Sequence, residues 1–106
     1  MSVGKLVRDK IPDIIRASGR TPRVTTLASR EFQVALTDKL DEEVAELIAA
    51  RTTDAVIEEA ADVVEVLMAM AGEWGVNLDN ILKAAHHKRT ERGGFSRRLW
   101  LDRIDE

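Results

Sequence analysis

The chain has 106 residues, a formal net charge of −3, no cysteine and 44% hydrophobic residues. This length predicts a single domain over residues 1–106, and the lack of cysteine excludes disulfides and thiolate metal sites. No apolar run approaches the about 18 residues of a membrane span, and MSVGKLVRDK lacks the apolar core of a signal peptide. We therefore expect a cytoplasmic protein with no membrane partner, and the acidic net charge argues against nucleic acid as a partner.

The first predicted element is a short helix over residues 9–18. Asp9 is its expected N-cap, Pro12 is tolerated in its first turn, and Gly19 ends it. The next nine residues, RTPRVTTLA at 20–28, contain proline and three threonines and show no helical period. They are expected to form a loop or a short strand.

Two long helices are predicted next, separated by a tight break at Thr52. The first begins at the expected cap residue Ser29 and ends near the break. The second is capped by Thr53 or Asp54 and runs to Gly75. The short connection predicts an antiparallel helical hairpin.

A further helix and an extended tail complete the predicted order. Asn77 is expected to cap this helix, which ends near Gly93. The fold class is therefore all-α, a helical hairpin with flanking helices. Because the apolar surface exceeds what one hairpin can cover, we expect a homodimer or homotetramer that completes the bundle. The large apolar side chains expected to pack in this core are Trp74, Phe95, Leu99, Trp100 and Leu101.

Acidic residues lie on the apolar faces of the two long helices, where helical periodicity predicts buried side chains. Glu43 falls inside the apolar face of the first helix and Glu46 borders it. Glu59 falls inside the apolar face of the second helix and Asp62 borders it. Glu46 and Glu59 lie equally far from the turn, as do Glu43 and Asp62. Antiparallel packing therefore brings the four carboxylates level with one another.

Four converging carboxylates predict a metal ion. Their mutual repulsion is strong in a half-buried cleft unless cations bind them, and all-oxygen ligation selects Mg²⁺, Mn²⁺ or Ca²⁺. Residues 31–82 hold thirteen acidic side chains and only two basic ones, Lys39 and Arg51. Pairing within this segment cannot neutralise it, so we predict an Mg²⁺ site that also accepts Mn²⁺. The alternative is that Glu43 and Glu59 pair with lysine or arginine, or lie at a solvated bundle edge.

Basic residues gather toward the two ends of the chain. Lys88, Arg89 and Arg92 continue the inward face of the last helix, while Arg8 extends the apolar face of the first helix and Lys10 lies nearby. Cations beside a metal site suit a phosphate chain that bridges the two. Favourable placement against the helix dipole is the alternative for the last helix. No glycine-rich phosphate loop is present, so metal and side chains would hold the phosphates.

The motifs EEVAE at 42–46 and EAAD at 59–62 resemble those of MazG-like, all-α nucleoside triphosphate pyrophosphohydrolases. KLVRDKIPDII at 5–15 and KRTERGGF at 88–95 resemble the small phosphoribosyl-ATP pyrophosphohydrolase-like branch. The resemblance implies cleavage between the α- and β-phosphates of a nucleotide, in homodimers or tetramers whose subunits can share a site. It implies that the Mg²⁺ ligands are Glu43, Glu46, Glu59 and Asp62, with Glu42 supporting them or positioning water.

The mechanism expected from these assignments is attack of a water molecule on the α-phosphorus. Glu42 or Glu46 assists as the base, and the basic side chains neutralise the departing pyrophosphate. Two other functions are compatible with the same residues. One is a regulatory module that binds Mg²⁺-nucleotide without turnover, and the other is a helical dimerisation protein whose acidic residues only solvate the bundle.

Overall fold

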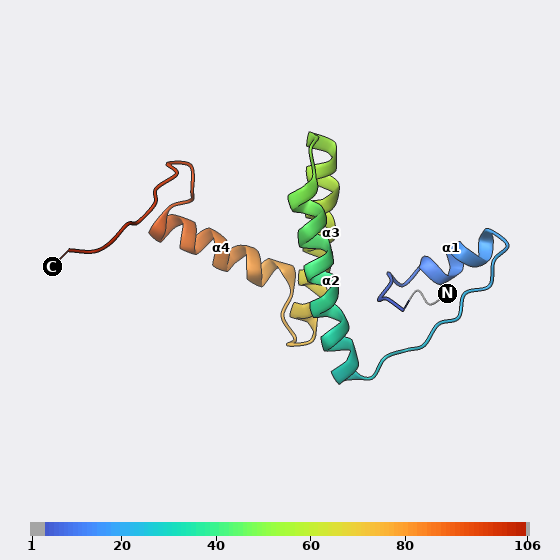
Figure 1. Ribbon diagram of the computed structural model, residues 1–106. Helices are drawn as coiled ribbons and strands as arrows, with labels where there is room; N and C mark the ends of the chain where they lie inside the picture. Colours follow the sequence, from blue (N-terminus) through green and yellow to red (C-terminus); the bar gives the residue numbers. More distant parts are fainter. Residues whose placement is uncertain (1–3, 106) are drawn as a thin grey trace.

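A computed structural model describes residues 4–105, which form four α-helices and no strand (Figure 1). The predicted all-α class is therefore confirmed. Residues 1–3 and the last residue of the predicted tail, Glu106, lie outside the described residues. None of the helices in residues 4–105 is long and apolar enough to cross a lipid bilayer. The helices are α1 Ile11–Ala17, α2 Ser29–Ala49, α3 Thr53–Gly72 and α4 Leu78–Arg92.

The N-termini of α3 and α4 are fixed by side-chain caps. The Thr52 hydroxyl accepts a hydrogen bond from the Ala55 N–H at 3.1 Å, so the cap lies one residue before the predicted Thr53. Asn77 is the cap of α4, as predicted, and forms a reciprocal capping box with Asn80 in which both bonds are 3.0 Å long. Such caps satisfy N–H groups that have no partner inside a helix. They therefore set where each helix starts.

Three other predicted boundaries are wrong by a few residues. The N-cap of α1 is Lys10 rather than Asp9, no side chain caps this helix, and the Ile11 N–H donates to the Arg8 carbonyl. Ser29 is the first helical residue of α2 and not its cap. The regular part of α3 ends at Gly72, and the chain then turns through Gly75, which has a positive φ of 69°. The segment 20–28 is a loop without a strand.

The α2–α3 hairpin is the packed part of the molecule. The two helices run antiparallel and lie side by side along most of their length (Figure 1). Leu36 of α2 and Val66 of α3 are the buried apolar residues of the described chain, and Glu43 is the buried charged one. One carboxylate thus lies within the small core of the hairpin.

The flanking elements leave much apolar surface uncovered. In Figure 1, α1 and α4 lie on opposite sides of the hairpin, and α4 meets α3 only near the turn that joins them. The radius of gyration is 18.4 Å, whereas a compact domain of this length has about 13 Å. The expectation that Trp74 and the tail pack into the core is wrong for the single chain, because no described element covers them. Their exposed fractions are 85% for Trp74, 96% for Phe95 and 86% for Trp100.

We expect this surface to be covered by further copies of the chain. Light scattering at micromolar concentration should give a homodimer or homotetramer, because two buried apolar side chains cannot stabilise a monomer of this length. The fluorescence of Trp74 and Trp100 should shift to longer wavelength on dilution as the assembly dissociates. A monodisperse monomer with concentration-independent fluorescence would contradict the expectation.

Candidate metal centre

Four carboxylates from two helices meet in the hairpin. Glu43 and Glu46 belong to α2, Glu59 and Asp62 to α3, and one oxygen from each lies within 4.8 Å of the others. The arrangement follows from the register of the hairpin, because the two pairs lie at equal distances from the turn. These are the four residues singled out from the sequence, and the structure brings them together. Their role as ligands stays a prediction.

Two oxygens of this cluster are buried without a partner. Within the described residues, Oε2 of Glu43 and Oε2 of Glu59 are inaccessible to solvent and accept no hydrogen bond. Glu43 as a whole is 6% exposed. An unpaired buried carboxylate oxygen costs folding free energy, and a hard divalent cation is the natural partner for such oxygens. The donor set therefore fits Mg²⁺ or Mn²⁺.

Lys39 compensates part of the charge from within α2. Its ammonium lies 3.2 Å from Oε1 of Glu43 and 3.4 Å from Oε1 of Glu42. Burial alone would lower the pKa of Lys39, but the hydrogen bonds and charges of Glu43 and Glu42 outweigh it and raise the pKa above its ordinary 10.5. Lys39 therefore stays charged. The expected alternative, pairing of Glu43 with a lysine, holds for one oxygen of this carboxylate and leaves Oε2 without a partner.

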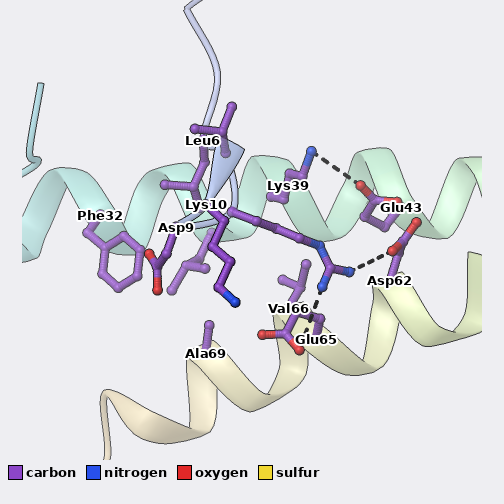
Figure 2. A pocket seen from close by; sticks show the side chains of 13 residues that line it. Leu6, Asp9, Lys10, Phe32, Lys39, Glu43, Asp62, Glu65, Val66 and Ala69 are labelled. Carbon is purple, nitrogen blue, oxygen red and sulfur yellow. Dashed lines mark hydrogen bonds and ion pairs between the residues drawn. The ribbon is translucent and has the colours of Figure 1, made fainter. Parts of the chain in front are cut away.

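Arg8 reaches the cluster from the segment before α1. Its Nη2 donates to Oδ1 of Asp62 at 2.7 Å, and its Nη1 lies 3.9 Å from Oε1 of Glu65. These ion pairs are the dashed lines at Asp62 and Glu65 in Figure 2. Arg8 is among the residues expected to bind phosphate. In this structure its guanidinium is held by Asp62, a carboxylate of the four-carboxylate cluster.

A cavity of about 550 Å³ opens beside the cluster, a size typical of small-molecule sites. The segment before α1 forms one wall and the two hairpin helices form the others. In Figure 2, Phe32 and Ala69 lie toward one end, and Glu43 and Asp62 toward the other. The lining residues are Leu6, Val7, Arg8, Asp9, Lys10, Phe32, Leu36, Lys39, Glu43, Asp62, Glu65, Val66 and Ala69.

Of the remaining predicted site residues, those on α4 and Glu42 lie apart from this centre within one chain, and Lys10 does not. Lys88, Arg89 and Arg92 are exposed on α4 and do not line the cavity. Glu42 lies beside Lys39 and outside the four-carboxylate cluster. Lys10 does line the cavity.

Sequence reasoning missed two contributors to the site. Lys39 stands four residues before Glu43, a spacing at which helical side chains meet. The ion pair between Lys39 and Glu43 could therefore have been predicted from the sequence. Glu65 lies 3.9 Å from Arg8 and also lines the cavity. That contact joins distant parts of the chain, and no local pattern signals it.

Comparison with known proteins gives the family. The family model of phosphoribosyl-ATP pyrophosphohydrolase matches residues 13–89, which include the whole hairpin and most of α4. An uncharacterized protein of Mycolicibacterium smegmatis is 61% identical over 56 residues, which make up 53% of this chain. The chain spans 57% of the length of that relative. No solved structure matches the chain.

The family match covers both acidic motifs and well over half of the chain, so the resemblance read from those motifs is confirmed. The chain belongs to the phosphoribosyl-ATP pyrophosphohydrolase family, a branch of the MazG-like nucleoside triphosphate pyrophosphohydrolases, which are hydrolases acting on acid anhydrides.

Proposed function

We propose that this protein hydrolyses a nucleotide between its α- and β-phosphates and releases a nucleoside monophosphate and pyrophosphate. The activity depends on Mg²⁺, for which Mn²⁺ can substitute. The observation that carries the proposal is the four-carboxylate cluster with two unpartnered buried oxygens, at one end of a cavity large enough for a nucleotide. The family match supports the reaction class.

Glu43, Glu46, Glu59 and Asp62 would hold the cation. Their oxygens form an all-carboxylate donor set, which hard cations prefer, and no histidine or cysteine belongs to the cluster. A bound Mg²⁺ supplies positive charge for the phosphates and makes water more acidic. Cation binding would stabilise Glu43 and Glu59 most, because each has a buried oxygen without any other partner among the described residues.

A carboxylate of the chain would take the proton from the attacking water. Glu46 and Glu42 are the two candidates, and Glu46 is favoured. Glu46 is the exposed member of the cluster and is not paired with a basic side chain of the described residues, so it would be the ligand least committed to the cation. Glu42 lies 3.4 Å from the Lys39 ammonium, so its carboxylate is already engaged in an ion pair.

Basic side chains would neutralise the pyrophosphate as it leaves. Arg8 and Lys10 line the cavity of the same chain. Lys88, Arg89 and Arg92 lie on α4, which extends away from the hairpin (Figure 1), so we propose that they serve the site of another copy in the oligomer. Cations placed where charge develops lower the barrier to phosphoryl transfer.

The substitution Glu59→Gln should abolish most of the Mg²⁺-dependent release of pyrophosphate, a loss of orders of magnitude. The amide keeps the shape of the side chain but removes the charge that a hard cation needs. The midpoint of thermal unfolding without metal should hold or rise, because repulsion within the cluster falls.

Glu58→Gln is the matched control, since Glu58 is the neighbouring residue, is exposed, and lies outside the cluster. It should change neither activity nor stability much. The metal assignment fails if the two variants behave alike, or if Glu59→Gln unfolds the protein and leaves the folded fraction fully active.

The variants Lys88→Ala and Arg92→Ala should raise the Michaelis constant while helicity and Mg²⁺ affinity stay nearly unchanged. The reason is that these cations are assigned to the phosphates of a neighbouring copy and not to the metal. A chain that carries both Lys88→Ala and Arg92→Ala, mixed with Glu59→Gln, should regain activity. In a mixed oligomer the first chain supplies an intact carboxylate cluster and the second supplies intact α4 cations to the same site. Unchanged kinetics in both single variants would leave these cations only a helix-dipole role.

A further inference from the structure

One wall of the substrate cavity is tied to the hairpin by a single side chain. Residues 6–10, the N-terminal wall, line the cavity opposite the hairpin helices (Figure 2). Arg8 donates to Asp62 at 2.7 Å and lies 3.9 Å from Glu65. Among the described residues, no other hydrogen bond or ion pair joins this wall to α2 or α3.

The rest of the wall is weakly held. Leu6 is half-buried, while Val7, Asp9 and Lys10 are exposed. The helix that follows, α1, packs against none of the other described helices. The Arg8 ion pairs are therefore the polar tether of the wall, beside the apolar contact of Leu6.

The carboxylate that anchors Arg8 is also a member of the four-carboxylate cluster. A guanidinium does not lose its proton in proteins, so the charge of Arg8 stays beside Asp62 at any ordinary pH. A divalent cation at the cluster must share Asp62 with this charge or displace it. Like charges so close repel each other, and the two cations oppose each other's binding.

We infer that Arg8 is a positioning residue that competes with the divalent cation for Asp62 and couples cation binding to the placement of the N-terminal wall. The inference rests on the proposed function, because it takes the cluster as the metal site. In the metal-free protein Arg8 holds the wall against the hairpin. Cation binding weakens this anchor and frees the guanidinium to meet the anionic phosphates in the cavity.

Lys39 shows why this coupling belongs to Arg8. Lys39 also neutralises a carboxylate of the cluster, Glu43, at 3.2 Å. However, Lys39 and Glu43 stand on the same helix, so exchange of Lys39 for a metal ion moves no element of the fold. Arg8 and Asp62 belong to elements that are far apart in sequence, and their exchange changes how one wall of the cavity is held.

The test is an Mn²⁺ titration of the full chain without nucleotide, by calorimetry. Arg8→Gln should lower the Mn²⁺ dissociation constant roughly fivefold, the effect of about 1 kcal/mol between partly exposed charges. Arg8→Lys keeps the charge and should stay near the wild type. Arg16→Gln is the control, since it removes the same charge from α1, where Arg16 pairs only with Asp13; it should leave the constant unchanged.

Tryptic cleavage after Lys5 and Lys10, which flank Arg8, gives a readout independent of affinity. Mn²⁺ should speed this cleavage in the wild type, whereas Arg8→Gln should be cleaved fast with or without metal. Unchanged Mn²⁺ affinity in Arg8→Gln, or a wall that becomes more protected with metal, overturns the inference and leaves the metal site standing. A wild-type protein that binds no Mn²⁺ overturns the proposed function and the inference together.

Discussion

Repulsion among four carboxylates is the constraint on which the rest of the structure depends. Glu43, Glu46, Glu59 and Asp62 each place an oxygen within 4.8 Å of the others, in the part of the molecule where the apolar core also lies. Like charges at such distances destabilise a fold unless they are neutralised. Lys39 and Arg8 neutralise the edges of the cluster and leave two buried oxygens without partners. The fold therefore carries two unsatisfied carboxylate oxygens in a cluster that could bind a metal ion.

The α2–α3 hairpin contains both the carboxylate cluster and the well-packed region of the described residues. The Thr52 cap fixes the start of α3, and with it the rotation of the carboxylates of α3 toward those of α2. A shift of one residue would turn each α3 side chain by about 100° and separate the pairs. Within residues 4–105, Leu36 and Val66 are the buried apolar residues, so little packing free energy opposes the repulsion. Neutralisation of the cluster and burial of the exposed apolar surface therefore matter for stability as much as for activity.

The sequence predicted the hairpin and the cluster because both depend on local periodicity. Helical spacing places Glu43 and Glu59 on apolar faces, and a short break forces the helices antiparallel. The Asn77 cap was predicted correctly, whereas the cap of α3 was missed by one residue, since the neighbouring hydroxyls of Thr52 and Thr53 are equally good caps. The packing of Trp74 and the tail could not be predicted, because helical periodicity gives the apolar face but not what covers it. The Arg8–Asp62 ion pair was not predicted for another reason. Its two residues are 54 positions apart, and no sequence pattern predicts a contact between such distant segments.

The most direct measurement is the identity of the products from a panel of nucleoside and deoxynucleoside triphosphates and phosphoribosyl-ATP, with and without Mg²⁺. Chromatography or phosphorus NMR separates a nucleoside monophosphate with pyrophosphate from a diphosphate with phosphate. We predict the first pair for at least one of these nucleotides, only when Mg²⁺ or Mn²⁺ is present. Saturable nucleotide binding without turnover of any of them, or release of diphosphate and phosphate, would contradict the proposed function.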